Sequence, residues 1–419
     1  MIDIKDKKEC CGCSACVQKC PKQCISLQED NEGFLYPFVD KKKCIDCGLC
    51  EKVCPVLQQN EPRKPLKVYA AINKDEEIRL QSSSGGIFTL LAEIIIDEGG
   101  VVFGARFDEN WEVKHDYTKT IEGLAAFRGS KYVQSRIEDN FKKAERFLKE
   151  GCKVLFSGTP CQIAGLKRYL RKDYDNLLTV DFICHGVPSP MVWRSYLSEV
   201  VRAKRETGKN LVSLSLNVTP FIKGVSFRDK TNGWEKYGFR IHYVASKATQ
   251  NMVSESTIED ICVLEHYRNN VYMKAFLSNV SLRPSCYACP AKMQKSHSDI
   301  TLADLWICKD NIYLDKYNDD KGLSCVLINS NINEDFLMSA QLYEIKLEDG
   351  LKANPCYFKS IKQPDNRENF WNSLHLTRNF ILSTLKYGKQ SFKERTRSYF
   401  IKLFIKLRII GIIKLIMKR

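Results

Sequence analysis

The chain has 419 residues, of which 44% are hydrophobic and 27% charged, and this composition excludes a collagen-like, low-complexity or wholly disordered protein. Its length predicts two or three domains. The formal net charge is +15, but residues 393–419 hold nine Lys or Arg and one Glu, which leaves only +7 for the rest of the chain. Because the excess lies mostly in this tail, we expect no nucleic-acid partner.

The cysteines are the most informative feature of the composition. There are 19 of them, and ten lie between Cys10 and Cys54. A disulfide framework is typical of short secreted chains, whereas this chain is long and opens with a polar segment rather than an apolar signal sequence. We therefore expect a cytoplasmic, reducing location and metal-bound cysteines.

A pattern of twelve residues with identical cysteine spacing occurs twice in this opening segment. The two runs read C-x2-C-x2-C-x3-C-P, and they are Cys10-Cys-Gly-Cys13-Ser-Ala-Cys16-Val-Gln-Lys-Cys20-Pro21 and Cys44-Ile-Asp-Cys47-Gly-Leu-Cys50-Glu-Lys-Val-Cys54-Pro55. Three closely spaced thiolates can bind three corners of a 4Fe–4S cube, and in two-cluster ferredoxins the fourth serves the partner cluster. The segment resembles bacterial dicluster ferredoxins over about residues 5–58. Paired C-x2-C motifs also build zinc sites, but four cysteines per run followed by proline favour iron–sulfur clusters.

This spacing assigns two ligand sets. One cluster is expected on Cys10, Cys13, Cys16 and Cys54, and the other on Cys44, Cys47, Cys50 and Cys20. Cys11 and Cys24 fall outside the pattern and are interpreted as packing or spare thiols.

After this segment, a polar, proline-bearing linker at 58–65 precedes an apolar strand at 68–72. The turn Ser82-Ser-Ser-Gly-Gly86 opens a helix at 87–97, and a strand follows at 101–105. A turn of this kind at a helix start can bind phosphate through free N–H groups. The alternative is a plain helix cap with glycines that allow tight packing.

A second unit has the same order of elements. A strand at 153–157 leads through Gly158-Thr-Pro-Cys-Gln162 into a helix at 163–170, and a strand at 177–183 ends in Cys184-His-Gly-Val-Pro188. This order predicts an α/β unit with parallel strands, whose functional loops lie at the carboxyl ends of the strands. Residues 226–238 are interpreted as a β-hairpin.

A third metal site is a hypothesis from the remaining cysteines. Cys286 and Cys289 have metal-ligand spacing, but a lone C-x2-C could be a redox dithiol, half a zinc site or half an iron–sulfur site. Cys161 and Cys184 lie on the strand-end loops and can complete the set. We therefore expect a third 4Fe–4S cluster on Cys161, Cys184, Cys286 and Cys289.

The combination of motifs resembles the beta subunits of coenzyme F(420) hydrogenases and dehydrogenases. The resemblance runs from about residue 5 to residue 330, and it is carried by Ser83-Ser-Gly-Gly86, Gly99-Gly-Val-Val-Phe-Gly-Ala105, Gly129-Ser-Lys-Tyr-Val-Gln-Ser135, Leu155-Phe-Ser-Gly-Thr-Pro-Cys-Gln162, Asp181-Phe-Ile-Cys-His-Gly-Val-Pro188 and the 286–306 segment. It implies an FAD-dependent iron–sulfur oxidoreductase. Fused bacterial relatives further suggest a surface-polysaccharide context. The family's Asp-x-Trp-Gly is replaced here by Asp304-Leu-Trp306-Ile307, which changes the shape expected of that loop.

The same resemblance places a flavin on residues of three loops, namely Ser83, Ser84, Gly85, Gly86, Lys131, Tyr132, Thr159 and Gln162. His185 is the candidate catalytic residue, as a proton donor to a reduced substrate. The alternative for His185 is a hydrogen bond within its loop.

The C-terminal tail, Tyr399 to Met417, is too short and too often interrupted by cations to span a membrane as a helix. A basic, imperfectly amphipathic helix suits an anionic membrane surface, so the inner face of the membrane is one candidate location for a chain expected in the cytoplasm. The alternative is a helix that packs on this protein or on a partner.

The predicted fold class is α+β, with a small dicluster ferredoxin-like domain, an α/β flavin-binding body and a C-terminal basic helix. The expected boundaries are 1–58 for the ferredoxin domain, 66–148 and 149–330 for the two regions of the body, 331–392 for an extension and 393–419 for the tail.

Two functions follow. The first is an iron–sulfur flavoprotein that reduces or oxidises an organic substrate. The alternative is an electron-transfer subunit without its own substrate, which feeds a ferredoxin-like or other redox partner.

Overall fold

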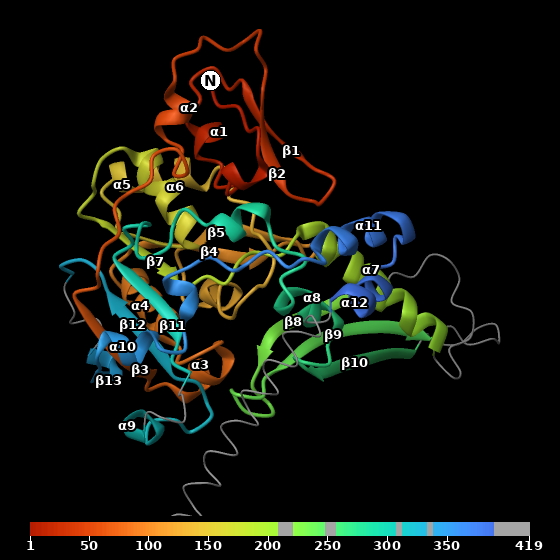
Figure 1. Ribbon diagram of the computed structural model, residues 1–419. Coiled ribbons are helices and arrows are strands. Elements are labelled where there is room, and N and C mark those ends of the chain that lie inside the picture. Colours follow the sequence, from red (N-terminus) through yellow and green to blue (C-terminus); the bar gives the residue numbers. More distant parts are fainter. Residues whose placement is uncertain (208–220, 248–256, 307–311, 333–337, 389–419) are drawn as a thin grey trace, which may run out of the picture.

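A computed structural model describes residues 1–207, 221–247, 257–306, 312–332 and 338–388 (Figure 1). The predicted tail helix at 393–419 lies outside these ranges. Within them, no helix combines the length and the apolar character that crossing a membrane requires.

The N-terminal module forms one end of the molecule (red in Figure 1). Each cysteine run winds into a short helix, α1 (Ala15–Lys19) and α2 (Leu49–Lys52), and a hairpin of β1 (Ile25–Glu29) and β2 (Leu35–Val39) lies between them. Both helices start after a residue in the left-handed region, Ser14 with φ 65° and Gly48 with φ 68°. The internal repeat of the sequence is therefore also a repeat of backbone conformation, as the ferredoxin-like prediction requires.

An eight-stranded mixed sheet forms the body. Its order is β13-β3-β12-β11-β7-β6-β4-β5, and the four strands β11, β7, β6 and β4 are parallel to their neighbours within that group. The outer strands β5, β12, β3 and β13 pair antiparallel. The bounds are β3 (Lys67–Asn73), β4 (Val101–Phe107), β5 (Val113–Thr118), β6 (Val154–Ser157), β7 (Leu177–Phe182), β11 (Ile300–Asp304), β12 (Ser324–Ile328) and β13 (Ala340–Glu344).

Alternating side chains of the central strands bury both faces of this sheet. Val102 of β4 packs with α4 (Ile87–Asp97), whereas its neighbours Val101 and Phe103 pack with α5 (Asn140–Lys149) and α6 (Pro160–Leu170). Near the β3 end, α10 (Leu347–Leu351) completes a further apolar cluster. The layers predicted for an α/β body are thus confirmed.

A second, antiparallel sheet of β8 (Phe221–Asp229), β9 (Gly238–Lys247) and β10 (Thr257–His266) lies to one side of the body (green in Figure 1). An aromatic core joins it to α7 (Pro190–Thr207), α8 (Val271–Leu277), α11 (Arg367–Thr377) and α12 (Phe380–Tyr387). The fully buried Phe34 of the N-terminal hairpin belongs to the same core. The N-terminal module is therefore packed into the body rather than held only by its linker.

The predicted helix at 87–97 and the strands at 68–72, 101–105, 153–157 and 177–183 are confirmed to within two residues at either end. The hairpin predicted at 226–238 is the turn between β8 and β9. Two short helices, α3 (Glu76–Gln81) and α9 (Ile312–Asp315), were not predicted. Strand β13 shows that the segment after residue 330 contributes an edge strand to the main sheet.

Candidate metal centres

The outer cysteine set surrounds a hollow at the far end of the N-terminal module. Cys20, Cys44, Cys47 and Cys50 all line it, together with the apolar side chains of Ile25 and Val39. Backbone N–H groups of Ile2 and Asp46 donate to the Cys50 and Cys44 sulfurs, at 3.3 and 3.4 Å. Such hydrogen bonds stabilise thiolate ligands and tune an iron–sulfur cluster.

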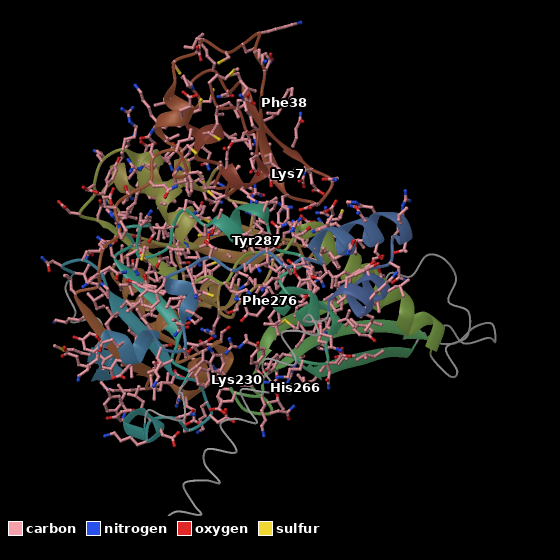
Figure 2. The ribbon with its side chains drawn as sticks, in the orientation of Figure 1. Lys7, Phe38, Lys230, His266, Phe276 and Tyr287 are labelled. Carbon is pink, nitrogen blue, oxygen red and sulfur yellow. The ribbon has the colours of Figure 1, made fainter. Side chains whose placement is uncertain are left out.

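Cys24 also lines this hollow, and its sulfur lies 3.4 Å from that of Cys20. From its irregular spacing we interpret Cys24 as a spare thiol, yet the structure places it beside the ligands of the outer set. The surroundings of the hollow are exposed: Cys47, Ile45 and Phe38 all lie at the surface, and Figure 2 shows Phe38 at this end of the molecule.

The inner set, Cys10, Cys13, Cys16 and Cys54, lies deeper. Burial, together with the neighbouring Cys10 and Cys54 sulfurs, raises the pKa of Cys16 to about 12. Burial likewise raises the pKa of Cys54, with Cys10 and Cys50 contributing in the same direction. Crowded, buried thiolates repel one another unless cations lie between them. The donor set therefore fits an iron–sulfur cluster.

The third set is assembled from distant parts of the chain. Cys161 lies in the first turn of α6, Cys184 follows β7, and Cys286 and Cys289 lie in and directly after η3 (Pro284–Ala288). Burial raises the pKa of Cys184 well above its usual range, and its charged neighbours include the other three cysteines and Lys292. Lys292 also donates to the Cys184 carbonyl at 2.8 Å. The four predicted ligands thus lie around one buried region.

In the described part of the chain, no three His, Cys, Asp or Glu side chains converge closely enough to hold a single metal ion. A cube of four iron atoms is wider than one ion and needs its cysteines further apart.

Cys11 connects the inner and third sets. It is buried, and the thiols of Cys13 and Cys161 lie close enough to shift its pKa, which is raised well above its usual range. Gly165 of α6 allows this approach, since a Cβ there would lie only 2.8 Å from the Cβ of Cys13. Only the docking of the module on α6 brings Cys161 next to Cys11, and the irregular spacing of Cys11 in the sequence gives no sign of this neighbour.

The predicted flavin residues lie on three segments: 83–86 directly before α4, 131–132 in the stretch after β5, and 159–162 at the start of α6. Segment 129–135 contacts the other two. The Ser83 hydroxyl accepts from the Ser130 N–H at 2.7 Å, and the Gln162 side-chain amide donates to the Ser135 hydroxyl at 2.9 Å. The Lys131 ammonium donates to three backbone carbonyls, and burial lowers its pKa to about 7. The Tyr132 ring stacks on Phe276, with centroids 4.6 Å apart.

His185 is held between two partners. One ring nitrogen lies 2.6 Å from the Asn279 side-chain oxygen, and the other lies 3.7 Å from the Cys356 sulfur. Burial lowers the pKa of His185, so the ring is neutral at pH 7. Both nitrogens are engaged within the protein, in agreement with the loop-hydrogen-bond alternative, and proton donation stays a prediction.

Comparison with protein families shows three matches in chain order. A 4Fe-4S dicluster domain matches residues 9–57. The N-terminal part of the coenzyme F420 hydrogenase/dehydrogenase beta subunit matches residues 68–140, and the C-terminal part matches residues 151–349. The chain belongs to the coenzyme F420 hydrogenase/dehydrogenase beta subunit family.

No curated protein matches this family member. Among solved structures, it is similar to a chain of the xenon-derivatised F420-reducing [NiFe] hydrogenase complex from Methanosarcina barkeri. The two share 16% sequence identity with a TM-score of 0.43, over 81% of this chain and 95% of that one.

The predicted flavin residues of this family member are less clearly free to bind a flavin than the cysteines are to bind iron. Thr159 and Gln162 form a reciprocal cap of α6, in which the Gln162 side-chain oxygen accepts from the Thr159 N–H at 2.9 Å. The Ser84 hydroxyl donates to the Leu323 carbonyl at 2.8 Å, and the Gly85 N–H donates to the Ser324 hydroxyl at 2.9 Å. These polar groups already have protein partners, so a flavin here would have to replace some of them.

Proposed function

We propose that the chain is an electron-transfer subunit that carries single electrons between a redox partner at the outer cysteine set and the body of the protein. Three 4Fe–4S clusters on the outer, inner and third sets supply one-electron oxidation and reduction when bound. The ligands are the twelve cysteines assigned from the sequence. The observation that carries the proposal is the series of three cysteine sets, from the exposed Cys47 through the buried Cys13 to the half-buried Cys286.

The change in exposure along this series supports a direction for electron entry. Cys47 is exposed and Cys13 and Cys16 are buried, whereas Cys161, Cys184, Cys286 and Cys289 of the third set are each half-buried. The outer set is therefore the most exposed of the three, and a partner can approach it most closely. The exposed Ile45 and Phe38 beside this set, 58% and 54% exposed, suit contact with another protein.

The protein's own residues hold and shield the thiols. Backbone N–H groups donate to Cys44, Cys50 and also Cys286, the last from Val187 at 3.4 Å. Docking of the module on α6 excludes water from the Cys11 and Cys13 thiols. A low-dielectric, hydrogen-bonded environment of this kind favours electron transfer over oxidation of the thiols.

The test is the iron and acid-labile sulfide content of protein purified without oxygen. We expect about twelve iron atoms per chain for three clusters. Cys286→Ser is expected to lower this to about eight, whereas Cys262→Ser, at an exposed cysteine of β10, is the matched control and should leave it unchanged. A wild-type content near zero, or an unchanged content in Cys286→Ser, would contradict the assignment.

A second candidate is a flavin-dependent enzyme with an organic substrate of its own. It is favoured by the hydrogen bonds that join segment 129–135 to the loop before α4 and to the start of α6, since ligands of α/β sheets bind at the carboxyl ends of strands such as β6. FAD released by acid from the same preparation would support this candidate. An absence of flavin from protein that holds its iron would contradict it. The substrate class, including the surface-polysaccharide context, stays a prediction.

A further inference from the structure

Arg283 is a buried cation at the junction of the module and the body. Its side chain is 1% exposed, and it is the residue directly before η3, three positions ahead of Cys286. The guanidinium donates to the Cys10 carbonyl at 2.8 Å and to the Leu35 carbonyl at 2.9 Å. It also donates to the Gln134 side chain at 3.0 Å. The inner and third cysteine sets are therefore joined through one side chain.

The same guanidinium reaches a proposed ligand directly. One of its nitrogens lies 3.5 Å from the Cys10 sulfur, and the guanidinium carbon lies 4.3 Å from the centre of the Tyr36 ring. Burial lowers the pKa of Arg283, but the Cys10, Tyr36, Cys11 and Cys286 groups more than offset that effect, so the pKa is raised. Arg283 is thus positively charged at any pH at which the protein is folded.

Arg283 has no carboxylate partner among the residues that the structure describes. A second buried arginine at the same junction, Arg367, provides the contrast, because it forms a bidentate ion pair with Glu32 of the module. An unpaired buried charge is strongly unfavourable. The compensating negative charge for Arg283 has to come from the cysteine side, where the Cys10 sulfur is the nearest anionic group.

We propose that Arg283 is a positioning residue that compensates the negative charge of the inner cluster and raises its reduction potential above that of the outer cluster. This inference rests on the proposed function. A reduced cluster carries one more negative charge than an oxidised one, and a fixed cation in a low-dielectric site stabilises the reduced form. The outer set has no comparable unpaired buried cation among the described residues that line its hollow. Lys22 is exposed there, and the half-buried Met1 ammonium is paired with the Asp46 and Glu51 carboxylates. Electrons entering at Cys47 would therefore pass inward.

The experiment is an anaerobic redox titration followed by electron paramagnetic resonance, on the full-length protein with iron counted in every sample. Signals are assigned by their loss in Cys47→Ser for the outer set and Cys286→Ser for the third. Arg283→Gln is expected to lower the midpoint potential of the inner cluster and leave that of the outer cluster unchanged. Arg283→Lys keeps the positive charge and should lower the midpoint potential of the inner cluster by less. Arg367→Gln, which breaks a docking contact without removing charge beside Cys10, is the matched control and should not shift it.

Two results would overturn the proposal. One is an unchanged inner potential in Arg283→Gln at full iron content, and the other is an equal shift in Arg367→Gln. If Arg283→Gln instead loses iron, the iron content of the other two variants decides. Full iron in both Arg283→Lys and Arg367→Gln supports charge compensation. An equal loss of iron in Arg367→Gln would mean that Arg283 acts only as a docking contact. Wild-type protein without iron would contradict the proposed function itself, so the two failures are distinguishable.

Discussion

Gly12 allows the sharpest test of how the module docks. Its φ is +72°, and a Cβ there would lie 2.9 Å from both the Arg283 guanidinium and the Gln134 side-chain nitrogen. Gly48 in the second cysteine run has nearly the same conformation, with φ +68°, but a Cβ there would meet only the Glu51 carboxylate at 3.9 Å. Gly12→Ala and Gly48→Ala therefore share the backbone strain and differ in the clash.

The magnitudes follow from these contacts. A left-handed alanine costs about 1–2 kcal/mol in either variant. In Gly12→Ala the guanidinium must also shift, because the nitrogen that the Cβ would meet is the one that donates to the Gln134 side chain, and losing one hydrogen bond to a charged group costs about 1.5–3 kcal/mol more. We expect Gly12→Ala to lower the free energy of unfolding by about 2.5–5 kcal/mol and Gly48→Ala by about 1–2 kcal/mol.

The assay is urea denaturation without oxygen, followed by far-UV circular dichroism and by the visible absorbance of the clusters. The urea midpoint should fall further for Gly12→Ala than for Gly48→Ala. Ser14 and Asp46 already adopt φ of 65° and 49° with side chains, so the module tolerates the backbone conformation itself. Equal midpoints for the two variants would refute the idea that Gly12 is required for docking against Arg283.

Three further predictions concern α6, a buried histidine and the outer cysteine set. Gly165→Ala should destabilise the protein by about 1–3 kcal/mol, because the added Cβ clashes with Cys13. The higher helix propensity of alanine offsets about 1 kcal/mol of this loss. A urea midpoint at or above the wild-type value would show that the module is not packed against α6. Burial lowers the pKa of His115 to about 4, so the unfolded chain takes up a proton first as the pH falls below 6.5, and stability should drop by about 3 kcal/mol between pH 6.5 and 4. His115→Gln should remove that part of the pH dependence of the urea midpoint, and an identical pH profile in this variant would contradict the assignment. Cys47→Ser should remove about four iron atoms and slow reduction of the remaining clusters by a protein donor, and stopped-flow reduction at the wild-type rate would argue against entry at the outer set.

Much of the site could be predicted because ligand spacing is local. Within each C-x2-C-x2-C-x3-C-P run, the spacing alone determines how the cysteines lie relative to one another. The strands at 68–72, 153–157 and 177–183 follow from apolar runs bounded by turn residues. The third set could be proposed because Cys161 and Cys184 both follow parallel strands, whose carboxyl ends share one edge of the sheet.

Other parts depend on contacts between segments that are distant in the sequence. Arg283 lies 273 positions from Cys10, and no periodicity or motif connects the two. The thiol contact of Cys11 with Cys161 arises only when the module packs on α6. The predicted flavin residues illustrate the same limit. The sequence shows a hydroxyl at Ser84 and an amide at Gln162, but only the structure shows that both already form hydrogen bonds within the protein.

An anaerobic reductive titration tests the central claim most directly, because it counts the electrons that each chain accepts. Three 4Fe–4S clusters predict about three electrons per chain, and a bound flavin would add about two. Loss of about one electron in Cys286→Ser, with none lost in Cys262→Ser, would confirm that the third set takes part. A chain that holds its iron but accepts no electrons would contradict the account.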